Sequence, residues 1–173
     1  MCIKGFVGLL ILLGAAFAAP ASPKCQEGIA QPSVRVLVTK LERAFKEKDA
    51  AAVANLAGCA FLVGEYESDN VSYVPPLVFA ERFLDEVEAL DLTLKEGDIG
   101  STYPKGPTRI FLWMGRGRKQ ATLFADHRPN ADFRHRHVFS FERSADGWRI
   151  TSYGTKDGDL LELLRRGYPG VLV

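Results

Sequence analysis

The three histidines of the chain lie close together in the sequence, at His127, His135 and His137. His135 and His137 are two residues apart, so on a strand their side chains point to the same face of a sheet. With His127 on the neighbouring strand of a hairpin, the three imidazoles can converge on Zn²⁺, and Asp126 or Asp132 can supply an oxygen ligand or a hydrogen-bond acceptor. No recognised metal motif surrounds them, and such histidines are more often structural. We therefore expect no metal and no cofactor.

The same histidines can also take part in general acid–base chemistry. The pairs that the sequence offers are His135 or His137 with Asp126 or Glu65. The chain contains no nucleophile elbow, no P-loop and no Gly-rich dinucleotide-binding motif. We therefore expect a non-enzymatic protein, and keep a small isomerase or dehydratase as the alternative.

Aromatic side chains recur on the segments that also carry the histidines. Apolar walls with a few polar groups are the usual design of a small-ligand pocket. Candidates for such walls are Tyr66, Trp113, Phe124, His135, His137, Phe139 and Tyr153. The alternative is an ordinary aromatic core.

Charge is balanced over the whole chain but segregated along it. The formal net charge is +1, which argues against nucleic acid as a partner. Residues 65–98 hold ten acidic and two basic side chains, and residues 105–150 hold ten basic and four acidic ones. The basic half can bind an anionic partner, with Arg116, Arg118 and Lys119 as candidates, or both runs can be solvated faces of the fold. The acidic stretch 65–70 is either a contact epitope or a solvated turn.

The N-terminal segment has the pattern of an export signal. Lys4 precedes an apolar run over residues 6–18, and Ala19-Pro20-Ala21 fits a cleavage site. The run is shorter than the ~20 residues that span a bilayer, so an uncleaved anchor is the lesser alternative. We expect a signal peptide over 1–21, a mature chain that begins at Ala19 or Ser22, and a periplasmic or secreted location without a transmembrane anchor.

Cysteine usage agrees with an oxidising compartment. Cys2 leaves with the signal, and the mature chain keeps Cys25 and Cys59. The sequence predicts one disulfide between them, which would tie the N-terminal tail to the first strand. Two free thiols, or a buried Cys59, are the alternative.

The mature chain reads as an irregular tail over 22–33 followed by a single α+β domain over 34–173. Ser33 and Asp49 are expected to cap the first two helices. Hydrophobic periodicity and turn residues predict helices over 34–47, 50–57, 77–90 and 158–166, and strands over 59–67, 71–74, 92–99, 108–115, 120–125, 134–142 and 148–153. Helices followed by consecutive strands indicate N-terminal helices packed on a curved antiparallel sheet, with a short C-terminal helix.

Two short stretches resemble the nuclear-transport-factor-2-like (SnoaL-like) superfamily. Residues 44–53 (AFKEKDAAAV) look like the junction of its first two helices, and residues 146–150 (DGWRI) look like its final hairpin. The resemblance covers about residues 34–155 and implies a cone-shaped fold with a cavity. The resemblance does not indicate whether the protein is an enzyme, a binding module or a domain with another role.

These observations favour an exported, non-enzymatic binding domain. It would hold a small ligand in a cone cavity, or a partner protein as an inhibitor or immunity protein does. The alternative is a small enzyme of that superfamily or a zinc-binding protein that uses the histidine cluster.

Overall fold

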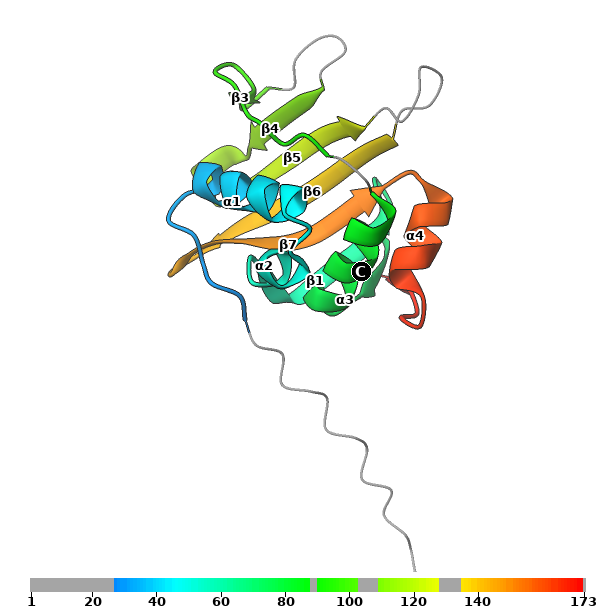
Figure 1. Cartoon of the computed structure of the whole chain (residues 1–173). Coiled ribbons are helices and arrows are strands. Elements are labelled where there is room, and N and C mark those ends of the chain that lie inside the picture. Colours follow the sequence, from blue (N-terminus) through cyan, green and yellow to red (C-terminus); the bar gives the residue numbers. More distant parts are fainter. Residues whose placement is uncertain (1–26, 88–89, 103–108, 128–134, 173) are drawn as a thin grey trace, which may run out of the picture.

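A computed structural model describes residues 27–87, 90–102, 109–127 and 135–172 of the 173-residue chain (Figure 1). Its centre is an eight-stranded sheet with the order β3-β4-β5-β6-β7-β1-β2-β8. The strands are β1 (Ala57–Glu65), β2 (Asn70–Tyr73), β3 (Ile99–Gly100), β4 (Ile110–Met114), β5 (Gln120–His127), β6 (His135–Ser144), β7 (Gly147–Thr155) and β8 (Val171–Leu172). The helices are α1 (Val34–Lys46), α2 (Ala50–Ala54), α3 (Pro76–Glu86) and α4 (Gly158–Arg165), and a short 3₁₀ turn, η1, spans Arg116–Arg118.

Local sequence explains where three of the helices begin. The Ser33 hydroxyl accepts a hydrogen bond from the Val36 amide at the start of α1, and the Asp49 carboxylate accepts one from Ala52 at the start of α2. Asp157 caps α4 in the same way. Both caps expected from the sequence are therefore confirmed, since these side chains satisfy amides that have no partner within the helix.

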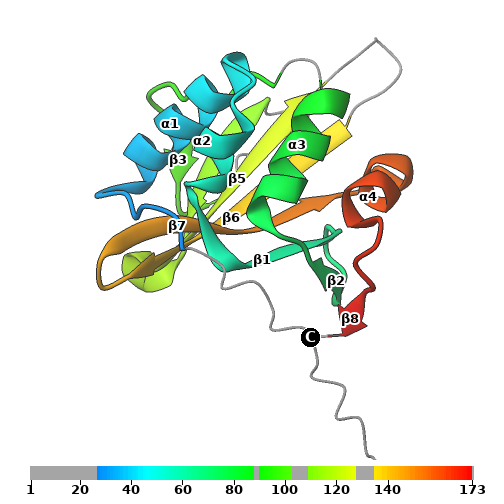
Figure 2. The ribbon, with the colours of Figure 1, turned by 60° about the horizontal axis from the view of Figure 1, so that its bottom comes forward.

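One side of the sheet is covered by helices. Helices α1 and α3 lie over this side (Figures 1 and 2). The buried stripe of α1 and the aromatic side chains of α3 pack into one core with Leu123, Phe139 and Tyr153. Successive strand residues point to opposite faces, so their neighbours in β5, β6 and β7 lie on the other side. The sheet therefore has a helix side, which forms the core, and an open side.

The expected fold class is confirmed, but the sheet is mixed rather than purely antiparallel. β1 runs parallel to β7 and β3 runs parallel to β4, while the other neighbours are antiparallel. Between β1 and its partner β7 the chain forms β2, α3 and the strands β3 to β6. The two strands are joined by a long crossover and not by a hairpin, so no turn motif in the sequence predicts that they run parallel.

Other local expectations need correction. Of the expected strand 92–99 only Ile99 lies in a strand, β3. Before it, Asp91 Oδ1 accepts from the Thr93 amide, Asp98 Oδ2 accepts from the Lys95 amide, and Gly97 has a φ of 97°. Such side-chain turns compete with a regular ladder. The second helix ends at Ala54 rather than at residue 57, where β1 already begins. Among the described residues, no helix is long and apolar enough to cross a membrane.

Candidate binding groove

The open side of the sheet carries two rows of side chains that run across the strands. Strand register places Trp113, Thr122, Ser140, Ser152 and Leu62 in one row. The next row along the strands contains Phe124, Val138, Gly154 and Gly64. The first row is hydroxyl-bearing between two apolar ends, and the second passes from an aromatic ring to two glycines.

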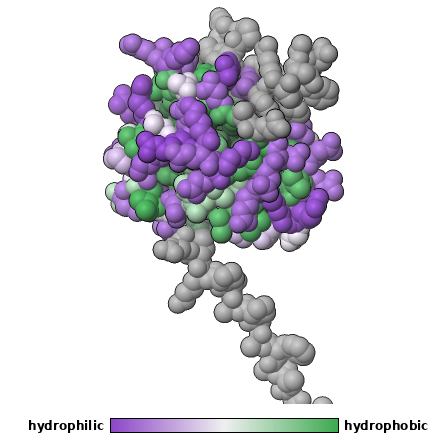
Figure 3. Space-filling model, viewed as in Figure 1, coloured by the Kyte–Doolittle hydropathy of each residue, from purple (hydrophilic) through white to green (hydrophobic). Residues whose placement is uncertain are grey.

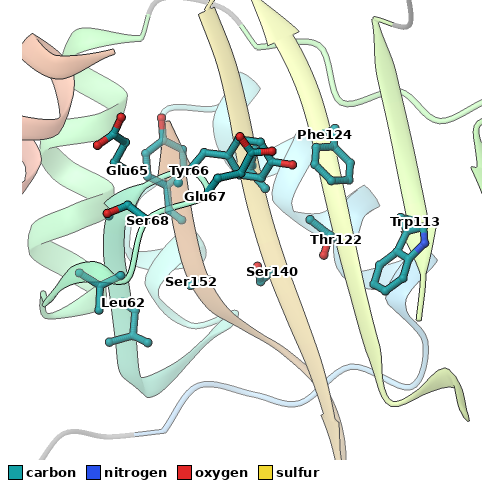
Figure 4. Close-up of a pocket in the computed structure, with 15 residues that line it drawn as sticks. Leu62, Glu65, Tyr66, Glu67, Ser68, Trp113, Thr122, Phe124, Ser140 and Ser152 are labelled. Atoms are coloured by element: carbon teal, nitrogen blue, oxygen red, sulfur yellow. The ribbon is translucent and has the colours of Figure 1, made fainter. Parts of the chain in front are cut away.

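These rows form the floor of a hollow of about 600 Å³ (Figure 4). A second hollow of about 430 Å³ extends toward Gln120 and Glu142. The two hollows share the whole first row: Leu62, Trp113, Thr122, Ser140 and Ser152. They are therefore parts of one continuous depression, which we call the open-face groove.

Tyr66 closes one end of the open-face groove. It follows β1, and its amide donates to the Thr155 carbonyl at 3.0 Å. Its ring meets Phe124 edge-on with centroids 5.9 Å apart. It lies over Gly154, where an added Cβ would stand 3.5 Å from the Tyr66 Cα atom. The backbone of Tyr66 therefore packs directly over the floor at Gly154.

Trp113 forms the opposite wall, on β4 (Figure 4). Its indole Nε1 donates to the Ser101 carbonyl at 3.1 Å, which fixes the ring orientation. The six-membered part of the ring lies against Gly115, since a Cβ there would be 3.2 Å from the ring. A rigid aromatic wall loses little entropy when it binds.

The charged residues that line the open-face groove are acidic: Glu65, Glu67 and Glu142. Lys156 pairs with Glu67 at 3.0 Å and lies over the Tyr66 ring, 5.7 Å from its centroid. At the other end the Gln120 amide donates to Glu142 at 3.4 Å. The middle of the groove is thus neutral and the charges stand at its ends.

His137 and Tyr153 meet on the helix side of the sheet. His137 Nδ1 and the Tyr153 hydroxyl form a hydrogen bond of 2.7 Å, and both side chains are buried. Phe83 meets both rings edge-on, and Phe139 packs on Tyr153. Burial raises the pKa of the Tyr153 phenol far above its usual range, so the hydroxyl stays neutral at physiological pH.

The acid–base candidates from the sequence do not converge in the described part of the chain. Ala125 is the β5 residue opposite His137, whereas Asp126 is opposite Arg136 and accepts from its Nε at 3.0 Å. Because strand side chains alternate, Asp126 and His137 belong to opposite faces. Glu65 is exposed at the end of β1.

The aromatic candidates divide in the same way. Tyr66, Trp113 and Phe124 line the open-face groove, whereas the rings of His137, Phe139 and Tyr153 pack on the helix side; Tyr153 also lies among the residues that border the groove. Among the groove residues that sequence reasoning did not name are Leu62, Thr122, Ser140 and Ser152. Strict alternation along β5, β6 and β7 was the signal that could have found them.

The histidine cluster is only partly visible. His127 and His135 are paired in register at the end of the β5–β6 ladder, and their side chains, like Asp132, lie outside what the structure describes. Among the described residues no group of three histidine, cysteine or carboxylate side chains is placed to hold a metal ion. Cys25 also lies outside the described residues, so its disulfide with Cys59 of β1 stays a prediction.

Comparison with known proteins gives structural matches alone. No protein-family model matches the chain, and no curated protein does. A steroid delta-isomerase from Pseudomonas aeruginosa matches with a TM-score of 0.46 and 11% identity, over 78% of this chain and 89% of that one. An NTF2-like protein of unknown function from Pseudomonas putida KT2440 matches with a TM-score of 0.42 and 11% identity, over 70% and 82%. A protein from Sphaerobacter thermophilus matches with a TM-score of 0.44 and 10% identity, over 73% and 96%.

Overlaps of this size carry nothing about activity. The function has to be argued from the chain's own side chains.

Proposed function

We propose that this chain is an exported, non-enzymatic binding domain that holds a partner in the open-face groove. The observation that carries the proposal is a hollow with the half-buried aromatic side chains Tyr66, Trp113 and Phe124, on the side of the sheet that no described helix covers. An uncovered hollow with apolar walls and a few hydroxyl groups is suited to binding, since the groups that fix orientation stand among groups that gain from leaving water.

The helix side supports the same assignment. Phe79, Phe83, Phe139 and Tyr153 stack ring against ring around His137. The surface of the molecule seen from that side is mainly hydrophilic, with apolar side chains scattered over it (Figure 3). His137 thus belongs to a packed core. The polar groups in the middle of the groove are the neutral hydroxyls of Thr122, Ser140 and Ser152, and its carboxylates stand at the two ends.

Export is the second part of the proposal, and the signal pattern over residues 1–21 supports it. A domain that works outside the cytoplasm would also favour the predicted Cys25–Cys59 disulfide.

A screen for binders tests the groove directly. Short peptides and apolar fragments are screened by ligand-observed NMR against the mature chain and against Ser140→Arg, which places a long charged side chain on the groove floor. Val36→Arg, at an exposed position of α1, is the matched control. We expect binders that are retained by the control and lost by Ser140→Arg. An empty screen, or binders that ignore Ser140→Arg, would contradict the proposal.

A further inference from the structure

We infer that the occupant of the open-face groove is an extended peptide segment of a partner protein with a basic end, an apolar centre and an acidic end. This inference rests on the proposed function and adds the chemical class of the partner. It follows from the length of the groove, the neutrality of its middle, the acidic lining beside Tyr66 and the basic turn that borders the opposite end.

The length of the groove fits a short extended segment. The β6 residues that line it run from Val138 to Glu142. Four residue steps at about 3.3 Å each give a floor of about 13 Å. Three or four extended residues cover the same distance, so a heptapeptide places its central residues on the floor and its terminal residues beyond the two ends.

The middle of the groove fits apolar side chains. Trp113, Phe124, Val138 and Leu62 offer apolar surface, and the hydroxyls of Thr122, Ser140 and Ser152 lie between them. The backbone of β5, β6, β7 and β1 is already paired on both sides within the sheet. A bound segment is therefore recognised through side chains on the sheet face and not as an added strand.

The end beside Tyr66 is suited to a cation. Glu65 and Glu67 line this end, and Asp69 follows in the same turn and is exposed. Lys156 already shows the mode of binding, since its ammonium group both pairs with Glu67 and stands over the Tyr66 ring. A lysine or arginine of the partner can use the remaining carboxylates in the same combination of ion pair and cation–π contact.

The opposite end is suited to an anion. The turn between β4 and β5 carries Arg116, Arg118 and Lys119, all exposed, directly before the groove residue Gln120. Three basic side chains of one turn thus border this end, and Glu142 offsets one of them.

This arrangement favours a dipolar segment over the other candidates. A wholly anionic ligand would meet Glu65 and Glu67, and a wholly cationic one would meet Arg116 and Arg118. Like charges brought together in an interface cost binding energy, whereas complementary ends set the register of the bound segment.

Fluorescence anisotropy with labelled heptapeptides tests the inference. The probes share a Leu-Phe-Val centre and carry two lysines at one end and two glutamates at the other, or four lysines, or four glutamates, or four serines. We expect the dipolar peptide to bind at least tenfold more tightly than either uniformly charged peptide, with the difference shrinking at high salt. Equal affinities for all four peptides would overturn the inference.

Charge reversal at the two ends supplies the matched controls. Glu65→Lys with Glu67→Lys should weaken the dipolar peptide, and so should Arg116→Glu with Arg118→Glu. All four changes together should restore binding, because the peptide can then lie in the opposite direction. Additive loss in the fourfold variant would contradict the inference.

The failure of this inference is distinct from failure of the proposed function. The serine peptide can bind as tightly as the dipolar one and lose affinity on Ser140→Arg. In that case the groove binds peptides but its charges do not select among them, and only the inference about the partner's charges is wrong. If no peptide binds and sedimentation shows a dimer that Ser140→Arg dissociates, the occupant is a second copy of this chain, and the peptide assignment is wrong. If neither peptides nor fragments respond to Ser140→Arg, the proposed function falls as well.

Discussion

At the scale of single residues, neighbours in the sequence lie on opposite faces of the sheet. Phe124 lies on the open side, and the next residue, Ala125, is opposite His137 on the helix side. The sequence indicated Tyr66, Trp113 and Phe124 as candidate walls of a small-ligand pocket, together with His137, Phe139 and Tyr153. It could not tell which of these residues lie on the open side and which lie in the core, because that depends on which side of the sheet the helices cover.

The buried hydrogen bond between His137 and Tyr153 makes a clear prediction. Tyr153→Phe removes the hydroxyl and leaves His137 Nδ1 without that partner, so the free energy of unfolding should fall by about 1–3 kcal/mol. Urea unfolding at pH 7 measures it. Tyr73→Phe, at a tyrosine that is 54% exposed, is the control and should change stability little. Equal effects of the two substitutions would show that this bond contributes nothing.

The same burial predicts how the tyrosines titrate. Because burial raises the pKa of Tyr153, its phenol should stay protonated at pH values where phenols in contact with water have already ionised. Absorbance near 295 nm should therefore rise in two stages with pH, and the second stage should coincide with unfolding. Tyr153→Phe should abolish the second stage, whereas its persistence would assign that stage to another tyrosine.

At the scale of elements, the helices were more predictable than the strands. Caps at Ser33 and Asp49 and the apolar stripe of α1 are local features, and they place the helices within a few residues. The pairing of β1 with β7, and the two-residue strands β3 and β8, depend on distant partners. No local pattern carries that information.

The β6–β7 hairpin allows a test of backbone geometry. Gly147 has a φ of 135°, and a Cβ there would stand 2.5 Å from the Gln31 carbonyl oxygen, beside the Gln31–Trp148 bridge. Gly147→Ala should lower the free energy of unfolding by about 2 kcal/mol or more. Gly117→Ala is the control: its φ is 80° but nothing lies within 4 Å of the added Cβ, so it should cost about 1 kcal/mol. A smaller loss at Gly147 than at Gly117 would contradict the contact with Gln31.

The same hairpin predicts a pH dependence. Hydrogen bonds from Arg149 and Ser144 hold the pKa of the Asp146 carboxyl well below its usual range. A carboxyl with a lower pKa in the folded chain stabilises it above the unfolded pKa of about 3.9, and that contribution is lost as the pH falls toward the folded value. Asp146→Asn should therefore flatten the decline of the unfolding midpoint between about pH 5 and pH 2. An unchanged slope would show that Asp146 does not contribute to it.

At the scale of the whole molecule, the sequence predicted an α+β chain with helices against a sheet, and that expectation is confirmed. The open-face groove needed the structure, since its floor draws on β1, β5, β6 and β7 and its walls on β4 and the turn after β1. Residues from 62 to 154 meet there only because the long crossover brings β1 beside β7.

Export makes a prediction for the mature chain. When the full sequence is expressed with a functional secretion pathway, the exported protein should begin at Ala19 or Ser22. Its intact mass should be two daltons below that of the reduced form, owing to the Cys25–Cys59 disulfide. Intact-mass spectrometry before and after reduction measures both. A full-length N-terminus, or a mass that reduction leaves unchanged, would contradict the corresponding part of the proposal.

The central claim is that this chain binds on the open side of its sheet. The most direct test is a ¹⁵N–¹H NMR titration of the mature chain with the dipolar heptapeptide or with the strongest binder from the screen. The account predicts amide shifts at Thr122, Ser140 and Ser152, with Leu37 of α1 and Phe83 of α3 unmoved. Shifts confined to Phe83, His137 and their neighbours would place binding on the helix side and contradict the account.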